Sequence, residues 1–100
     1  IMTELEQLQA SAGQAATLLK AMSNPRRLLI LCTLCGAPGT SAGELARATG
    51  LSPSATSQHL ARMREEGLIA STREAQRILY FIKNDAVHQL ISTLKTLYCP

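Results

Sequence analysis

Two helix-start patterns lie close together in the middle of the chain, separated by Gly50. The first, Ser41-Ala42-Gly43-Glu44, has capping-box spacing, in which a hydroxyl and a carboxylate cap each other's backbone N–H groups. The second, Ser52-Pro53, combines an N-cap with a proline at the first helical position. A short helix over 44–49, a glycine C-cap and a tight turn therefore lead into a second helix that runs to about Glu66. This order of elements is typical of a helix-turn-helix.

Similar cap patterns divide most of the remaining chain into helices. Thr3-Glu4-Leu5-Glu6 has capping-box spacing and opens an apolar stripe of helical period that runs to Met22. Ser23-Asn24-Pro25 provides an N-cap and a first-turn proline for a helix that ends near Gly36. Its predicted apolar face carries Leu28, Leu31, Cys32 and Cys35. Asn84-Asp85 caps a last helix, whose predicted apolar face is Val87, Leu90, Ile91, Leu94 and Leu97 or Tyr98.

A β-hairpin separates the helix-turn-helix from the last helix. Leu68–Thr72 and Ile78–Ile82 are short, β-prone runs, and the segment Arg73–Arg77 between them is charged. The chain is therefore predicted to be mainly α with a small β-hairpin. The order α-α-α-α-β-β-α is that of a winged helix-turn-helix, with residues 1–100 forming a single domain.

The composition suggests that this domain pairs with a second copy. Hydrophobic residues make up 46% of the chain, but it has no Trp, one Phe and two Tyr. A core built from Leu, Ile, Ala and Val in so short a chain is marginal by itself, so burial against a second protomer is expected. We therefore expect a homodimer.

The chain carries no pattern for secretion, membrane insertion or catalysis. No apolar run approaches the length that spans a bilayer, and the first residues lack a basic stretch followed by an apolar one. We therefore expect a cytoplasmic protein without a membrane partner. An enzyme is not expected, because the chain has no phosphate-binding loop, no acid paired with a nucleophile and no open metal position.

Polar and basic residues gather where a winged helix would meet DNA. The net charge is +3, and basic residues concentrate between Arg62 and Lys83. The first turns of a recognition helix meet base edges in the major groove, where Gln can pair with adenine and Arg with guanine. A basic wing can reach phosphates or the minor groove. The predicted contacts with double-stranded operator DNA are Ser52, Ser54, Thr56, Ser57, Gln58, His59, Arg62 and Arg64 on the helix, and Arg73 and Arg77 on the wing.

Four segments resemble the ArsR/SmtB family of regulators. They are Asn24–Leu31, Ser41–Ala46, Ser54–Leu60 and Glu66–Ile69, and the resemblance extends over essentially the whole chain. It implies a repressor that binds a palindromic operator as a dimer. It also implies that the first and last helices form the dimer interface and that an inducer releases the repressor from DNA.

Many members of this family sense metals, so the family metal sites can be compared with this sequence. One site needs a Cys-x-Cys pair in the helix before the recognition helix, but here Glu44–Ala48 contains no thiol. Another needs Asp-x-His near the start of the last helix. Here Asp85-Ala86-Val87 lacks the His, and His88 is one residue out of register. We therefore expect neither family metal site. A soft metal ion held by three thiolates, from Cys32, Cys35 and Cys99, stays as an alternative.

Cys32 and Cys99 resemble the dithiol of the sulfide- and persulfide-responsive branch of the family. In the predicted fold they lie on helices that pack together, where a disulfide or longer sulfur bridge can form if the sulfurs approach. The resemblance implies that reactive sulfur species, or oxidants, cross-link the two thiols and release the operator. Cys35 has no place in this two-thiol pattern, and it either competes for pairing or packs.

Other interpretations of these features stay open. The cysteines can be small core residues, and Cys99-Pro100 is a dipeptide found at thiolate haem contacts, although no cofactor is required. The alternative functions are a metal-responsive repressor, a DNA-binding protein without an inducer and a protein-interaction module. Only binding to DNA is expected to weaken with added salt, because phosphate contacts release counterions. Serine in place of either cysteine is expected to remove only an inducer response.

Overall fold

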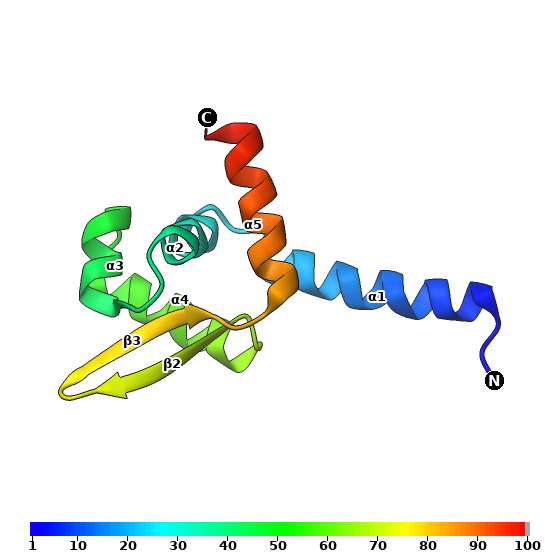
Figure 1. The fold of residues 1–100 in the computed structure, drawn as a ribbon, viewed down its shortest axis with the longest axis horizontal. Coiled ribbons are helices and arrows are strands. Elements are labelled where there is room, and N and C mark those ends of the chain that lie inside the picture. The colour runs from blue at the N-terminus through cyan, green and yellow to red at the C-terminus, as the bar shows by residue number, and fades with distance from the viewer. Residues whose placement is uncertain (100) are drawn as a thin grey trace.

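The computed structural model of the chain describes residues 1–99 as five helices and three strands (Figure 1). The helices are α1 (Glu4–Met22), α2 (Pro25–Gly36), α3 (Ala42–Thr49), α4 (Pro53–Glu65) and α5 (Asp85–Tyr98), and the strands are β1 (Thr40–Ser41), β2 (Ile69–Glu74) and β3 (Arg77–Ile82). The predicted order of helices and hairpin is confirmed, with β1 as an addition. Pro100, which belongs to the predicted domain and to the Cys99-Pro100 dipeptide, lies outside the described residues.

Each helix begins at a polar side chain that accepts hydrogen bonds from the backbone N–H groups of its first turn. These caps are Thr3, Asn24, Ser41, Ser52 and Asn84. Glu6 and Glu44 accept hydrogen bonds in return from two of them, which completes both predicted capping boxes. α3 ends at Gly50, whose φ of 72° lies in the left-handed region that favours glycine. The predicted caps are therefore confirmed, although α3 begins at Ala42 and not at the predicted residue 44.

Replacing Asn24 by Ala is expected to lower the free energy of unfolding by about 1 kcal/mol. The Asn24 Oδ1 atom accepts hydrogen bonds from the N–H groups of Arg26 at 2.9 Å and Arg27 at 3.1 Å, where α2 enters the core. Thr3→Ala is the matched control, because the first turns of α1 are exposed and their cap should matter little. Urea unfolding followed by circular dichroism compares the two variants. Equal losses would contradict this account of the α2 cap.

β3 lies between β1 and β2 in an antiparallel sheet. β2 and β3 pair over their whole length and leave only Ala75 and Gln76 as the turn. The hairpin is thus longer than predicted, and Arg73 and Arg77 lie on strands instead of in a loop. β1 pairs with the middle of β3. The sequence did not predict β1, because a strand of two residues lacks the alternating run that marks a strand.

The core lies between α2, α5, the two helices of the helix-turn-helix and the base of the hairpin. Its fully buried residues of large volume include Ile30, Leu31, Leu34, Leu45, Leu60, Met63, Leu68, Ile69, Val87 and Ile91. The predicted apolar face of α2 is partly wrong, because Ile30 and Leu34 are buried while Cys32 and Cys35 are only half-buried. α2 contacts α3, α5 and β3 together. Its buried arc is therefore centred on Ile30, Leu31 and Leu34, and the two cysteines lie at its margin.

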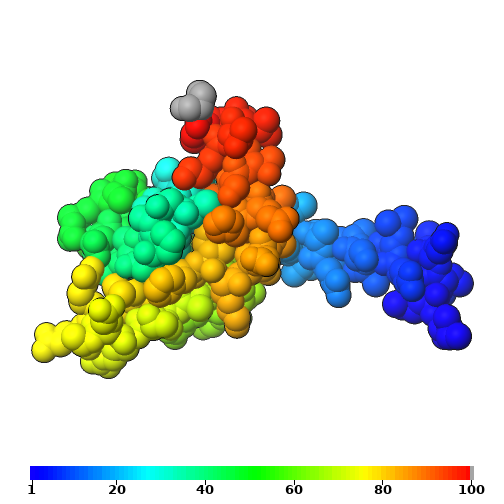
Figure 2. Space-filling model, in the orientation of Figure 1, coloured from blue at the N-terminus to red at the C-terminus, as the bar shows by residue number. Residues whose placement is uncertain are grey.

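α1 stands away from the rest of the protomer (Figures 1 and 2). The radius of gyration is 15.1 Å, whereas a compact chain of this length has about 13 Å. Large apolar side chains stay exposed on α1, at Leu5, Leu8 and Leu19, and at the end of α5, at Leu97 and Tyr98. The apolar stripe predicted for the first helix therefore covers little of this protomer's own core.

Within residues 1–99, no helix is both long and apolar enough to cross a lipid bilayer.

Candidate nucleic-acid interface and thiol pair

The first turns of α4 present a row of exposed polar side chains. Ser52 caps the helix, and its Oγ atom accepts a hydrogen bond from the Ala55 N–H at 3.1 Å. Beyond the cap, the exposed polar side chains of the first turns are Ser54, Ser57 and Gln58, and the last turn adds the exposed Arg62, Arg64 and Glu65. The serines are small enough to let the helix approach a groove closely, and Gln and Arg can each make two hydrogen bonds to a base edge. With Ser52, six of the eight predicted helix contacts are thus exposed.

Thr56 does not suit the predicted contact with DNA. It is fully buried, and its hydroxyl donates to the carbonyl oxygen of Ser52 at 2.9 Å. Thr56 stands four residues before Leu60 and seven before Met63, which is the spacing of one helix face. This spacing was the signal that could have assigned Thr56 to the core.

Arg64 and His59 were also predicted to contact DNA, but in the structure each is engaged elsewhere or partly buried. The Nη1 atom of Arg64 donates to the Ser71 hydroxyl at 3.0 Å and so links α4 to β2. His59 is half-buried, and its buried Nδ1 atom has no hydrogen-bond partner in the part of the chain that the structure describes. Burial of the ring, followed by the charges of Arg27, Arg26 and Arg62, lowers the pKa of His59. The ring therefore stays neutral to lower pH than an ordinary histidine.

The low pKa of His59 predicts that stability falls on mild acidification. Above the unfolded-state pKa of 6.5 the ring is neutral in both states, and stability does not change with pH through this group. As the pH falls below 6.5, the unfolded chain takes up a proton that the folded chain does not, so unfolding becomes more favourable until the folded-state pKa is passed. Urea unfolding between pH 7.5 and 5 measures this slope. His59→Gln should flatten it, whereas a slope that persists in that variant and disappears in His88→Gln would contradict the assignment.

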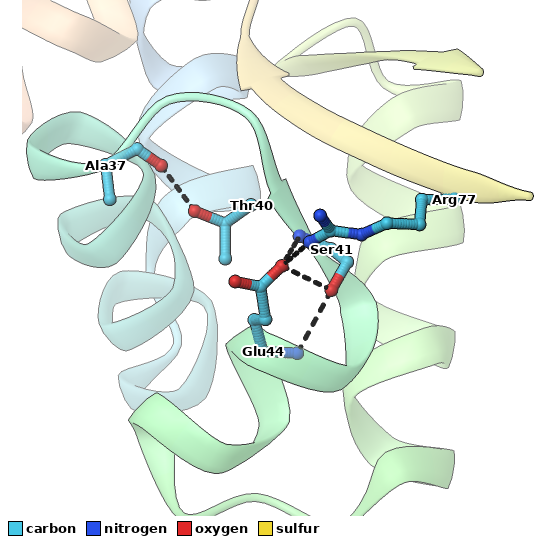
Figure 3. A network of polar contacts seen from close by, with 5 residues as sticks. All are labelled: Ala37, Thr40, Ser41, Glu44 and Arg77. Atoms are coloured by element: carbon cyan, nitrogen blue, oxygen red, sulfur yellow. Dashed lines mark hydrogen bonds and ion pairs between the residues drawn. The ribbon is translucent and has the colours of Figure 1, made fainter. Parts of the chain in front are cut away.

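The wing carries its two arginines on either side of the turn. Arg73 is exposed, and its Nε atom donates to the carbonyl oxygen of Ala75 at 3.3 Å. Arg77 instead forms an ion pair with Glu44 at the start of α3 (Figure 3). Hydrogen bonds from the Ser41 hydroxyl and N–H, and then the Arg77 guanidinium, hold the pKa of Glu44 below its usual value. Glu44, the carboxylate of the α3 capping box, thus also binds Arg77 of the wing. The sequence did not predict this ion pair.

Cys32 and Cys99 lie on the two helices that the sequence predicted to pack together. α2 and α5 contact each other directly. Both thiols are free, with Cys32 half-buried in α2 and Cys99 exposed at the end of α5. Burial raises the pKa of Cys32, and the nearby thiol of Cys99 raises it further, while Lys95 opposes the change. The two thiols thus belong to neighbouring helices, with Cys99 the more accessible of the two.

Cys35 has polar partners on α5. Its Sγ atom lies 3.7 Å from Nε2 of His88 and 3.6 Å from the Ser92 hydroxyl oxygen. It therefore faces a different part of α5 from the end that carries Cys99. Among residues 1–99, no three His, Cys, Asp or Glu side chains come together in a way that could hold a metal ion. The structure thus does not gather the three cysteines into the thiolate metal site considered as an alternative.

Comparisons with known proteins give the same fold and class of function. The family described as "Bacterial regulatory protein, arsR family" matches residues 24–71, which contain the helix-turn-helix. Over 99 residues the chain is 77% identical to the HTH-type transcriptional regulator YgaV of Escherichia coli, covering 99% of this chain and 100% of that protein. Over 95 residues it is 43% identical to the transcriptional activator HlyU of Vibrio cholerae, covering 95% of this chain and 87% of HlyU.

A solved structure extends the similarity to the whole winged fold. The chain matches the crystal structure of the transcriptional repressor BigR from Xylella fastidiosa with a TM-score of 0.84 and 34% identity, covering 99% of each chain. The predicted winged helix-turn-helix is confirmed. The family is one of DNA-binding transcriptional regulators and not of enzymes, as the sequence indicated. The chain belongs to the ArsR family of bacterial regulatory proteins.

Proposed function

We propose that the chain is a homodimeric repressor that leaves its DNA operator when reactive sulfur bridges Cys32 and Cys99. The observation that supports the sulfur part is the placement of Cys32 on α2 and of Cys99 at the end of α5, because these two helices contact each other directly. The DNA part is supported by membership of the ArsR family and by the exposed polar face of α4.

The operator contacts follow from which side chains are accessible. Gln58 is the candidate for a base edge, and Ser54, Ser57 and Arg62 are the candidates for phosphates beside it. Arg73 on the wing is exposed and bonds only to the nearby Ala75 carbonyl within residues 1–99, so it can turn to a phosphate. Arg77 can do so only by leaving Glu44, so the wing exchanges an internal carboxylate for a DNA phosphate.

The dimer is proposed from the apolar surface that one protomer leaves exposed. Leu5, Leu8 and Leu19 on α1 and Leu97 on α5 are large apolar side chains in contact with solvent. The exposed leucines of α1 lie on its apolar stripe of helical period, and a helix stripe that stays uncovered within a protomer is typical of an interaction surface. A two-fold dimer buries the same patch on both copies and presents two α4 helices to an imperfect palindrome.

The sulfur chemistry balances with a low-molecular-weight persulfide, RSSH, as the oxidant. The exposed Cys99 thiolate attacks the outer sulfur of RSSH, RSH leaves, and Cys99 carries a persulfide. The Cys32 thiolate then attacks the Cys99 sulfur and hydrogen sulfide leaves, so the protein has lost two electrons and RSSH has gained them. When a second RSSH first converts Cys32 to a persulfide, the same step leaves a trisulfide. Cys32 is the slower thiol because its raised pKa leaves less thiolate.

Release from DNA follows if the bridge changes the geometry of the dimer. The bridge joins the end of α5 to α2, and α2 packs directly on α3 of the helix-turn-helix. A shift of α5 in a dimer interface alters the spacing of the two α4 helices, and a bistable interface amplifies small shifts. A relative, BigR, is described as a repressor and another, HlyU, as an activator. We assign repression to this chain because the bridge between Cys32 and Cys99 is proposed to lower its affinity for the operator.

The experiment is a fluorescence anisotropy titration of a duplex that the reduced protein has selected from a random library. The affinity should fall steeply as salt is raised, because phosphate contacts release counterions. Treatment with a persulfide donor should weaken binding roughly 10-fold or more. An affinity independent of salt would indicate a protein-interaction module instead. Equal affinities before and after treatment would indicate a DNA-binding protein without this inducer.

A further inference from the structure

A pocket of about 630 Å³ opens between the C-terminal half of α1, the start of α2 and the C-terminal half of α4. Three cationic side chains, from Lys20, Arg27 and Arg62, line it together with one carboxylate, from Glu66. Neither cysteine of the proposed bridge lines this pocket. The excess of positive charge favours a negatively charged ligand.

Arg27 supplies an incompletely paired guanidinium at this pocket. Its side chain is only 11% exposed. The Nη1 atom donates to the carbonyl oxygen of Ala21 at 2.7 Å and to Oε2 of Glu66 at 3.1 Å. Its Nε and Nη2 atoms have no hydrogen-bond partner within residues 1–99. A largely buried guanidinium with free donors is suited to an oxyanion, which can accept two parallel hydrogen bonds from it.

His59 supplies a second unsatisfied group in the same pocket. Its Nδ1 atom is buried and has no partner among the described residues. A buried polar atom without a partner costs free energy unless a ligand or water completes it. The ring lies in the positive field of Arg26, Arg27 and Arg62, which disfavours its protonation. An anion beside Nδ1 would accept its hydrogen bond and offset that field.

We propose that this pocket is a binding site for an oxyanion of phosphate or carboxylate type, held by Lys20, Arg27, His59 and Arg62. Glu66 keeps Arg27 in place while leaving two of its donor atoms for the ligand. His59 and Arg62 belong to α4, so the site lies directly on the helix that carries the proposed operator contacts. Two sources fit the chemistry: a backbone phosphate of the bound DNA, or a small free anion that regulates α4.

The test is a titration of the reduced full-length protein with inorganic phosphate, with potassium chloride keeping the ionic strength constant. The ring signals of His59 are followed by NMR, and His88 serves as an internal reference outside the pocket. A bound anion should shift the His59 signals saturably in the millimolar range and raise the pKa of His59 by roughly 1 unit. Lys20→Gln should weaken binding roughly 3-fold. Lys83→Gln, an exposed lysine outside the pocket, carries the same change of charge and should have no effect.

The source of the anion is distinguished by adding the selected duplex. If DNA occupies the pocket, it shifts the His59 signals in the same direction, and phosphate competes with it at constant ionic strength. If the pocket takes a free anion, His59 still responds to phosphate in the protein–DNA complex. The proposal is overturned if the His59 shift does not saturate, if His88 shifts equally, or if the two lysine variants behave alike. None of these outcomes depends on release by sulfur, so failure here leaves the proposed function untouched.

Discussion

Cys32→Ser and Cys99→Ser should each bind the selected duplex like the unmodified protein and should each fail to release it after persulfide treatment. Neither thiol belongs to the exposed face of α4 or to the wing, so the operator contacts stay intact. Either serine removes one sulfur of the bridge, and the remaining thiol can gain sulfur but cannot close onto α2 or α5. The expected change is from a release of roughly 10-fold or more to none. Anisotropy with matched treated and untreated samples measures it.

Cys35→Ser is the matched control for these variants. The serine hydroxyl can keep the polar contacts with His88 and Ser92, and the Cys32–Cys99 pair is retained. Cys35→Ser should therefore respond to persulfide as the unmodified protein does. A response that is lost in Cys35→Ser and kept in Cys99→Ser would assign the chemistry to Cys32 and Cys35.

Ile91→Ala should lower the free energy of unfolding by about 3 kcal/mol, within the range of 2–5 kcal/mol for such truncations in a core. Ile91 is fully buried on α5 and belongs to the same cluster as Ile30, Leu31 and Leu34 of α2. Small domains have a total stability of only about 5–15 kcal/mol, so this loss should leave a marginally folded protein. Urea unfolding followed by circular dichroism measures it.

Two further substitutions on α5 test whether the effect comes from the cavity. Ile91→Val removes a single methylene group and should cost about 1 kcal/mol. Thr96→Ala lies on the exposed side of the same helix, where its hydroxyl bonds only to the Ser92 carbonyl, and should change stability little. Alanine has the highest helix propensity, so a loss in Thr96→Ala as large as that in Ile91→Ala would contradict the assignment of the effect to core packing.

The helix starts could be predicted because capping is local. Ser41 and Glu44, or Ser52 and Pro53, are close in sequence, and the hydrogen bonds that they make need no other part of the chain. β1 could not be predicted in this way. Its two residues form a strand only because β3, far along the chain, offers backbone partners, and such pairings leave no local pattern.

The orientation of each helix was predicted less well than its position. Apolar spacing placed Leu31 of α2 in the core but also favoured the two cysteines over Ile30 and Leu34. α2 has several apolar residues in succession, and its three neighbouring elements decide which arc is buried. Hydroxyl side chains add a further ambiguity, since Thr56 and Ser57 are adjacent and similar, yet only Ser57 is exposed.

The wing and the pocket depended on contacts between distant segments. Glu44 was recognised as a cap, and Arg77 as a candidate for DNA contact, but nothing in the sequence paired them. Lys20, Arg27 and His59 likewise belong to three different helices that meet only in the folded chain. The proposed pairing of Cys32 with Cys99 came from the family resemblance, and the structure bears on it only through the contact between α2 and α5.

The most direct test of the sulfur-bridge claim combines intact mass with peptide mapping on the protein that has left the duplex. The reduced chain is treated with a persulfide donor, and the released and retained fractions are separated and digested without reduction. The account predicts a Cys32–Cys99 cross-link in the released fraction, either a disulfide or a bridge lengthened by sulfur, with free thiols at both positions in the retained fraction. Release without a bond between these two cysteines would contradict it.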